Sequence, residues 1–423
     1  MLLEFSVENY LSFKELATFS MLTAPSVKEH PEHTFPYKNK SLLKTAAIYG
    51  ANGSGKSNLI KAMKFMKDFV HSSSKESQVG DKINVERFRL SSETDDKPCF
   101  FEIIFVQNEI KYRYGFTTDQ NKIFSEWLYQ TEKTKEAELF YRNEEGIITI
   151  GSKFKNAEPL KAIVRNNALF LSVTAQFNIK ISIQVLEWFN KNFVVITTDM
   201  IGSKLAPTLD SKFKDTNEKT IINNFIKIAD LGIDDILVEK SKISENTLPN
   251  YLNGEIRKHL LEIESVKIST THNKYDGKKN LISKETFDLE KNESDGTRKF
   301  LGLSTHIIDA ILHNHVLIID EIDARLHSHI TRTLIDLFNN YDSTNSQLIF
   351  STHDINLLDK EIMRRDQIWF TEKDNYGSSI LYSLVEYKVR NDASFERNYI
   401  NGRYGAIPIL GDFKSILKVN NET

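Results

Sequence analysis

The segment Gly50-Ala51-Asn52-Gly53-Ser54-Gly55-Lys56-Ser57 decides the fold, because it joins a predicted buried strand over 43–49 to a predicted helix. Its glycines let the backbone curl so that several N–H groups and the helix N-terminus point toward one place, an arrangement that binds phosphate. Lys56 adds a cation, and Ser57 adds a hydroxyl ligand for Mg²⁺. The flanking strand and helix favour a phosphate-binding loop over an incidental glycine-rich turn.

A second polar motif follows the apolar run Val316-Leu317-Ile318-Ile319, which predicts a buried strand. Asp320 and Glu321 come directly after it. We expect Asp320 to hold Mg²⁺, directly or through water, and Glu321 to polarise an attacking water. A strand that ends in two acids is often only a solvated loop, and the phosphate loop upstream is what favours the nucleotide interpretation.

The composition sets limits on function. The chain has 423 residues and a net charge of −3, so attraction to nucleic acid would need a local basic patch or a partner. Cys99 is the single cysteine, and neither a signal peptide nor an apolar stretch of about 20 residues is present, so we expect a cytoplasmic protein without a membrane segment.

The order of patterns predicts an α/β fold with a nucleotide site assembled from two distant parts of the chain. From Cys99 to Ile150 apolar residues alternate with polar ones, which predicts an antiparallel meander. Helix and strand alternate again near the end, with a helix through Phe300–Leu312 and strands at 316–319 and 347–350. We therefore predict a discontinuous head over 1–150 and 290–423, with an inserted α/β subdomain over 151–289 that serves as a partner-binding region.

Within the insertion and before it, the local predictions are coarser. They are a short strand over 16–19, helices near 160–171 and 183–189, and a hairpin that turns near Asp276-Gly277.

Two further polar segments lie at informative distances from Asp320. Ser294 and Gly296 come shortly before the strand that leads to Asp320 and open the predicted helix, where an ordinary helix cap is the competing interpretation. His353 comes after Asp320, just beyond the next predicted strand. A histidine in such a loop is often only a surface residue, and its order and spacing here favour contact with a nucleotide.

These motifs together resemble ATP-binding-cassette heads, including those of SMC-like and RecF-like ATPases. The long interval between Lys56 and Asp320 fits that class, and the segment around Ser294 resembles its signature motif. The resemblance implies ATP and Mg²⁺ as ligands and a head-to-tail dimer in which Ser294 and Gly296 reach the ATP of a second subunit. It also implies that His353 senses the γ-phosphate, and that the segment 323–327 crosses the dimer interface.

Motifs near both ends of the chain indicate which members of this class the sequence resembles. Asn9-Tyr10-Leu11-Ser12-Phe13 is similar to the start of RecF-, SMC- and OLD-like ATPases, where the next strand packs beside the base; a plain strand-turn-strand is the alternative. Arg390-Asn391-Asp392 and the segment 401–408 resemble RloA-like AAA ATP-binding proteins related to OLD nucleases. Arg403 is either a partner contact or a helix-end cap. Such proteins act in antiphage defence beside an effector, often a TOPRIM-like nuclease.

Departures from these relatives shape the interpretation. The segment that follows His353 is too short for a nuclease module, so we expect the nuclease to be a separate protein that brings any contact with nucleic acid. Heptad repeats are absent, which argues against a long-armed SMC protein. Gln78 is a weak candidate for the glutamine that couples hydrolysis to motion.

The leading prediction is a slow, regulatory ATPase that forms a homo-oligomer, a dimer or higher, and controls an effector. The alternative is a RecF-like DNA-binding repair ATPase, with Lys61, Lys64 and Lys67 or Lys278-Lys279 as its basic patch. A transporter ATPase is a third possibility, but the N-terminal motif fits that class of protein poorly.

Two histidine pairs are set apart from the nucleotide motifs. His327 and His329 are interpreted as surface or interface residues at a helix start. His30-Pro31-Glu32-His33 looks like part of a metal site, but the sequence shows no evident third ligand.

Overall fold

The computed structural model describes residues 1–75, 78, 80–197, 205–229, 232–242, 253–254, 257, 264–341, 344–388 and 394–408. The chain divides into two compact units. Unit 1 comprises Met1–Val195, Asn314–Ile322 and Ile335–Thr423, and unit 2 comprises Ile196–His313 and Asp323–Leu334. Both therefore combine segments that are distant in the sequence, at boundaries other than the predicted insertion over 151–289.

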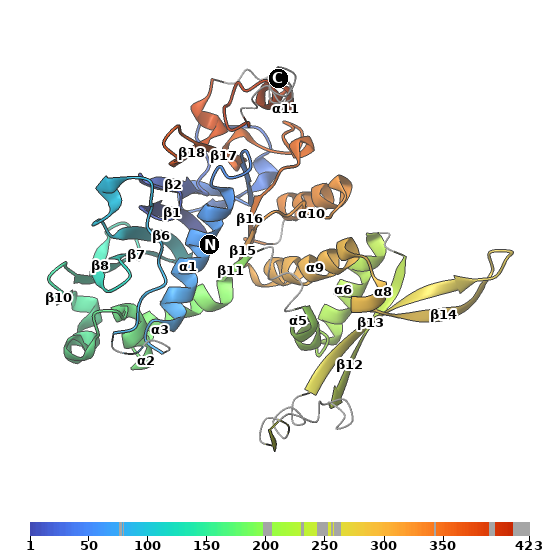
Figure 1. Ribbon diagram of the computed structural model, residues 1–423, viewed down its shortest axis with the longest axis horizontal. Coiled ribbons are helices and arrows are strands. Elements are labelled where there is room, and N and C mark those ends of the chain that lie inside the picture. The colour runs from blue at the N-terminus through green and yellow to red at the C-terminus, as the bar shows by residue number, and fades with distance from the viewer. Residues whose placement is uncertain are drawn as a thin grey trace, which may run out of the picture. The chain divides into compact units, whose positions relative to one another are not determined.

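One sheet of unit 1 has seven antiparallel strands in the order β10-β9-β8-β7-β6-β1-β2 (Figure 1). Its middle is the predicted meander, in which inward residues alternate with outward ones. The strands are β1 (Leu2–Glu8), β2 (Ala17–Ser20), β6 (Cys99–Gln107), β7 (Ile110–Thr118), β8 (Ile123–Thr131), β9 (Ala137–Arg142) and β10 (Ile148–Ile150).

The second sheet of unit 1 carries the nucleotide motifs. Its order is β11-β15-β16-β5-β17-β18, and β15, β16, β5 and β17 run parallel. The central strands are apolar and fully buried, as expected for a sheet covered on both faces. The strands are β5 (Thr45–Tyr49), β11 (Phe193–Ile196), β15 (Val316–Ile319), β16 (Gln347–Ser351), β17 (Ile368–Lys373) and β18 (Ser379–Ser383). The strand predicted over 43–49 is thus two strands, because Lys44 separates β5 from β4 (Lys40–Leu43), which pairs with β3 (Thr34–Tyr37).

The helices of unit 1 complete its hydrophobic core. α1 (Lys56–Ser72) buries Leu59, Met63, Met66 and Val70, as the periodicity predicts. The core continues into residues 154–193, where Trp188 stacks on Phe105 at 4.0 Å between ring centroids. The other helices are α2 (Phe170–Gln176), α3 (Lys180–Glu187), α11 (Phe395–Ile400), the π-helix Trp188–Asn192 and the 3-10 helices Pro31–His33, Ser92–Thr94, Ser152–Ile163, Ile355–Leu357, Arg365–Gln367 and Leu384–Glu386.

The helix predicted near 160–171 is wrong in its position. A 3-10 helix ends at Ile163, and α2 begins only at Phe170. Between them the amide of Asn167 donates to the backbone carbonyls of Gln78 (2.8 Å) and Asp81 (3.1 Å), and Arg142 donates to the carbonyl of Ala168 (3.1 Å). These distant contacts hold the chain in a turn that local apolar spacing does not reveal.

Unit 2 contains the antiparallel sheet β12-β13-β14 and several helices. β13 and β14 form the hairpin predicted near Asp276-Gly277, and Asp276 accepts hydrogen bonds from the backbone N–H groups of Lys278 and Asn280 in its turn. α9 buries the apolar face predicted over 300–312 apart from Leu312, which is exposed. The elements are α5 (Leu205–Lys212), α6 (Thr216–Ile228), β12 (Ile233–Lys242), β13 (Glu264–Tyr275), β14 (Leu281–Asp288), α8 (Leu289–Asn292) and α9 (Asp295–His313); α10 (Ser328–Asn340) follows β15 in the chain.

The described part of the C-terminal segment packs against β17 and β18. The backbone carbonyl of Tyr404 accepts hydrogen bonds from the hydroxyls of Tyr382 (2.7 Å) and Tyr387 (3.1 Å), and Tyr399 donates to the carbonyl of Ala406 (3.0 Å). This segment is therefore a packing element of unit 1. The predicted motif Arg390-Asn391-Asp392 lies outside the described residues.

Across the described ranges, none of the helices combines the length and apolar character needed to cross a lipid bilayer.

Candidate functional site

The phosphate loop lies between β5 and α1, as the sequence predicts. Gly55 requires glycine for two reasons. Its φ is +122°, and a Cβ there would lie 2.4 Å from Ser379 Oγ. A Cβ on Gly50 would lie 2.3 Å from the carbonyl oxygen of Thr371. The loop is thus held close to β17 and β18 in a conformation that a side chain at either glycine would disrupt.

Hydroxyl groups from three other segments fasten the loop. Ser379 Oγ donates to the carbonyl of Ser54 at 2.6 Å and lies 2.7 Å from Ser12 Oγ. Asn58 Nδ2 also donates to Ser12 Oγ at 2.8 Å, while Ser54 Oγ and Thr371 Oγ1 are 2.7 Å apart. All but Asn58 are buried, so these bonds are shielded from water and fix the loop before any ligand arrives.

The two side chains of the loop that are expected to bind phosphate and Mg²⁺ have protein partners in this structure. Lys56 Nζ donates to the carbonyls of Gly50 (2.7 Å) and Ala51 (3.2 Å). Ser57 Oγ donates to Asp320 Oδ1 at 3.1 Å. The hydroxyl and carboxylate that the sequence assigns to Mg²⁺ therefore meet, although 263 residues separate them.

Asp320 and Glu321 follow β15 and are fixed by Ser351, the last residue of β16. Ser351 Oγ donates to Asp320 Oδ1 at 2.6 Å and accepts from the backbone N–H of Glu321 at 2.7 Å. The backbone N–H of Ile322 donates to the carbonyl of Ser351 at 3.1 Å. Glu321 has a φ of 51°, a conformation that costs a residue other than glycine about 1–3 kcal/mol. The contacts with Ser351 offset that cost, orient the Asp320 carboxylate and hold the backbone of Glu321.

A cavity of about 300 Å³ joins these parts, a size at the lower end of small-ligand pockets. Its lining combines the loop, the expected base and the expected phosphate sensor. The lining residues are Asn52, Gly53, Ser54, Gly55, Lys56, Ser57, Asn58, Glu321 and His353. The structure thus brings together at one place the loop residues, Glu321 and His353.

Ser294 and Gly296 belong to unit 2, where they form the start of α9. Ser294 Oγ accepts from the backbone N–H of Thr297 at 3.1 Å, so Ser294 caps the helix. A Cβ on Gly296 would lie 2.8 Å from the carbonyl oxygen of Arg325, whose guanidinium pairs with Asp295 at 2.6 Å. The signature-like segment and the segment 323–327 are therefore in direct contact within unit 2.

The remaining predicted residues have local roles. Asn9 Oδ1 accepts from the backbone N–H of Phe88 (3.1 Å), and its Nδ2 donates to the carbonyl of Lys97 (2.7 Å). The backbone N–H of His329 donates to His327 Nδ1 (3.2 Å) at the start of α10. Gln78 is exposed and contacts Asn167 through its carbonyl.

The sequence interpretation missed four residues at the site: Asn58, Ser351, Thr371 and Ser379. Ser351 stands just before His353, and its position at the end of a buried strand was an available signal. Thr371 and Ser379 carry no local signal, because each contacts Ser54 from a strand near the other end of the chain.

A phosphate loop after β5, carboxylates after β15 and a mainly parallel sheet between them define an α/β P-loop head of the ABC type. Residues 46–359 match the family model described as "AAA domain, putative AbiEii toxin, Type IV TA system". Because this match spans well over half of the chain, the protein belongs to that family.

The chain is also similar to solved SMC heads. A head bound to the C-winged helix domain of ScpA has 14% identity and a TM-score of 0.43, over 90% of this chain and 97% of that chain. The SMC head domain from Thermotoga maritima has 13% identity and a TM-score of 0.39, over 90% and 98%. An Smc head with an extended coiled coil, bound to the C-terminal domain of ScpA derived from Pyrococcus furiosus, has 13% and 0.40, over 95% and 98%. Among curated proteins nothing matches this chain.

Proposed function

We propose that this chain binds ATP with Mg²⁺ at the loop cavity, hydrolyses it slowly, and through ATP-dependent assembly controls a separately encoded effector, a TOPRIM-like or other nuclease of antiphage defence. The observation that carries the proposal is the meeting of Ser57 with Asp320 beside the cavity that Glu321 and His353 line. The RloA-like and OLD-like resemblance at the chain ends supports the finer assignment to defence.

The loop binds the triphosphate. The N–H groups of the loop and the N-terminus of α1 favour negative charge, and Lys56 exchanges the carbonyls of Gly50 and Ala51 for phosphate oxygens. The residues present fit a Mg²⁺ ion, since Ser57 and Asp320 offer the hard oxygen ligands that this ion prefers. Bound Mg²⁺ neutralises charge on the phosphate oxygens and orients the γ-phosphoryl group.

Glu321 acts as the general base that takes a proton from the attacking water, and His353 donates a hydrogen bond to the γ-phosphate. Both line the cavity. Ser351 holds the Glu321 backbone in position, so the base is oriented before ATP binds.

Assembly uses the start of α9. Ser294 and the neighbouring N–H groups of α9 bind the γ-phosphate held by a second subunit, so that ATP lies between two heads in a head-to-tail dimer or a larger assembly. Hydrolysis removes the shared γ-phosphate and loosens the interface, and an effector bound by the assembly is thereby controlled.

Phosphate release by the purified chain tests the assignment of the base. Glu321→Gln is expected to slow hydrolysis about 100-fold while ATP binding is retained, because the amide cannot accept the proton. Glu145→Gln, on an exposed loop, is the matched control and should leave the rate unchanged. If Glu321→Gln hydrolyses ATP at the normal rate, Glu321 is not the base.

Sedimentation of the Glu321→Gln protein tests the assembly, because the slow variant holds ATP long enough to be observed. ATP should raise its mass at least to that of a dimer. Adding Ser294→Arg should keep the mass of a monomer and leave ATP binding intact, whereas Ser283→Arg on exposed β14 should assemble normally. Assembly that survives Ser294→Arg would refute the shared site.

Native mass spectrometry of the protein expressed with its genomic neighbour, with and without ATP, tests the effector. The RecF-like alternative predicts instead that the isolated chain binds bare DNA in a salt-dependent way. Its basic patch on α1 is weakened by local contacts, since Lys64 pairs with Asp68 and Lys67 donates to the carbonyl of Phe193 (2.6 Å). Tight, salt-sensitive binding to DNA without a partner would favour the alternative.

A further inference from the structure

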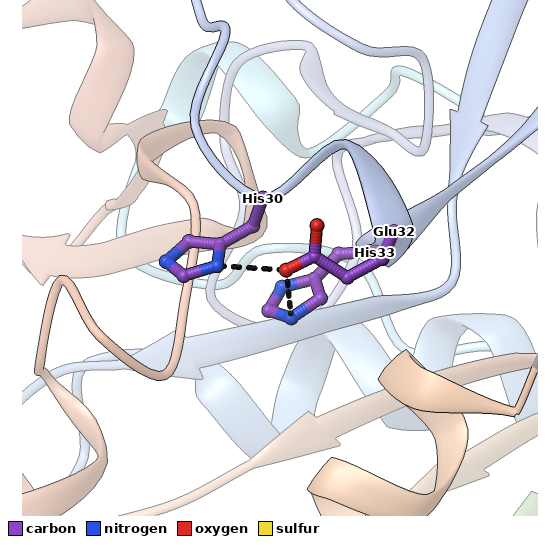
Figure 2. A group of neighbouring side chains, drawn as sticks. All are labelled: His30, Glu32 and His33. Carbon is purple, nitrogen blue, oxygen red and sulfur yellow. Dashed lines mark hydrogen bonds and ion pairs between the residues drawn. The ribbon is translucent and has the colours of Figure 1, made fainter.

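Away from the loop cavity, His30, Glu32 and His33 converge at the 3-10 helix Pro31–His33 (Figure 2). His30 Nδ1 lies 2.9 Å from Glu32 Oε1, and His33 Nε2 lies 3.6 Å from the same oxygen. The three ligand atoms lie within 4.8 Å of one another, and the two imidazole rings are stacked. The structure thus brings the carboxylate of Glu32, which stands within the sequence motif, together with both histidines.

The outer nitrogen of His30 is engaged elsewhere. His30 Nε2 lies 2.7 Å from the backbone carbonyl of Lys360, and a carbonyl can only accept a hydrogen bond. Nε2 therefore carries a proton, and Nδ1 of the neutral ring presents its lone pair toward Glu32.

The outer nitrogen of His33 is engaged in the same way. His33 Nδ1 lies 3.2 Å from Gln367 Oε1, which also accepts from the backbone N–H of Arg364 at 2.8 Å. The amide nitrogen of Gln367 donates to Thr45, so the orientation of the amide is set by several contacts. The proton of the neutral His33 ring is thus on Nδ1, and its unprotonated Nε2 lies 3.6 Å from Glu32 Oε1.

When both rings are neutral, three atoms that carry lone pairs and no hydrogen therefore lie close together. His30 Nδ1 and Glu32 Oε1, which are 2.9 Å apart, then repel each other unless a proton or a metal ion lies between them. Histidines that bind metals typically donate their other N–H to a carbonyl or carboxylate, which fixes the tautomer and the ring orientation, and both rings here have that arrangement.

We propose that His30 Nδ1, Glu32 Oε1 and His33 Nε2 bind a divalent transition metal ion of the Zn²⁺ class. At Zn–N distances of about 2.0–2.1 Å, two ligands of a tetrahedral site are roughly 3.3 Å apart. The observed 2.9 and 3.6 Å lie on either side of that value. The side chains of His30 and Glu32 are 23% and 43% exposed, so an ion can enter and water can take the fourth position.

Arg364 and Arg365 lie at the start of the 3-10 helix Arg365–Gln367, whose Gln367 contacts His33, and both arginines have other partners. Arg364 is paired with Asp366 at 2.8 Å, and Arg365 is paired with Glu29 at 2.7 Å. Because both arginines pair with other carboxylates, the Glu32 carboxylate interacts with the histidines instead.

The position of the site indicates a structural role. The carbonyl of His33 accepts from the backbone N–H of Lys44 at 2.9 Å, and Gln367 links the His33 ring to Thr45, the first residue of β5. A bound ion would fasten the 3-10 helix to the base of the strand that leads into the phosphate loop. His30 itself has a φ of 46°, a left-handed conformation that is uncommon for residues other than glycine, although histidine adopts it more often than most, and an ion would help to hold it.

Calorimetric titration of the full-length, tag-free protein with ZnCl₂, without nucleotide, tests the proposal. One Zn²⁺ should bind per chain, and Co²⁺ in its place should give the visible absorption of a tetrahedral site. His30→Ala and Glu32→Gln should each weaken binding by at least about tenfold. His71→Ala is the matched control, because His71 is an exposed histidine whose Nδ1 partner is the amide oxygen of Asn190 rather than a carboxylate.

Asp320→Asn changes the nucleotide site only and should leave Zn²⁺ binding unchanged, so this variant distinguishes binding at the two sites. A proton on His30 Nδ1 is the competing occupant, and it would make the contact a plain ion pair with Glu32. Absence of stoichiometric Zn²⁺ binding by the unmodified protein, or equal binding by His30→Ala, overturns the proposal. Should a variant misfold by circular dichroism, the Co²⁺ spectrum of the unmodified protein decides the matter.

Discussion

Ser351→Ala probes whether one buried hydroxyl positions both carboxylates of the nucleotide site. The hydroxyl is fully buried and makes two hydrogen bonds, one to Asp320 Oδ1 (2.6 Å) and one from the backbone N–H of Glu321 (2.7 Å). Removing it loses a hydrogen bond to a charged group, worth about 1.5–3 kcal/mol. It also leaves the N–H of Glu321 without its partner, although water can reach that half-buried group.

We expect Ser351→Ala to weaken the binding of Mg²⁺ more than the binding of the nucleotide. A residue that orients a metal ligand typically changes metal affinity by about 10–100-fold when it is removed, which is about 1.4–2.7 kcal/mol. We therefore expect the Mg²⁺ concentration for half-maximal ATP hydrolysis to rise by about that factor. Binding of ATP without Mg²⁺ should change little, because Ser351 does not line the loop cavity.

The assay is phosphate release over a Mg²⁺ titration, alongside urea unfolding. Ser346→Ala is the matched control: Ser346 immediately precedes β16, and within the described part of the chain its buried Oγ has no hydrogen-bond partner. That variant should keep the normal Mg²⁺ dependence and lose little stability. If Ser351→Ala keeps the normal Mg²⁺ dependence as well, Ser351 does not position Asp320.

Gly55→Ala should lower ATP affinity and reduce stability by more than about 1 kcal/mol, because its Cβ would meet Ser379 Oγ at 2.4 Å; Gly277→Ala, on the exposed turn between β13 and β14, meets open space and is the control in fluorescence binding and thermal melts. Burial raises the pKa of Glu126 above its usual 4.5, against the opposing N–H groups of α2. The stabilisation that this raised pKa gives the folded protein is therefore fully present below pH 4.5 and is lost as pH rises through the folded-state pKa. In urea unfolding, the difference in the free energy of unfolding between the native protein and Glu126→Gln should therefore shrink from pH 4.5 upward. Burial also raises the pKa of Cys99 to about 12, so iodoacetamide at pH 8 should label the folded protein far more slowly than the urea-unfolded protein; equal rates by mass spectrometry would show that the thiol is accessible.

Local chemistry made the main parts of the site predictable. The phosphate loop needs glycines, a lysine and a serine in a fixed order, so its pattern is legible in one segment. The strand before Asp320 is a short apolar run, and the structure reproduces it as β15 with the predicted ends. Such features depend on neighbours in the sequence, and sequence reasoning captures them.

Features that depend on distant contacts were not predictable. Lys44 interrupts the strand predicted over 43–49, and its Nζ donates to the carbonyl of Asn339 (2.9 Å), in a helix far along the chain. Asn167 likewise ends the expected helix near 160–171 by bonding to backbone carbonyls before β6. In each case a buried polar group required a partner, and the fold met that requirement at the cost of a regular element.

The same reasoning explains why the loop requires the C-terminal strands. A phosphate-binding backbone must leave most of its N–H groups available to a ligand, so it has to be held mainly by other groups, even though the N–H of Ser54 donates to the carbonyl of Ala51 (3.1 Å). The protein holds the loop instead through carbonyls and side chains: Ser379 donates to the carbonyl of Ser54, and the Thr371 hydroxyl contacts the Ser54 hydroxyl. β17 and β18 thus fix the loop from the side that the ligand does not use. A change in either strand should therefore affect ATP binding without touching the nucleotide.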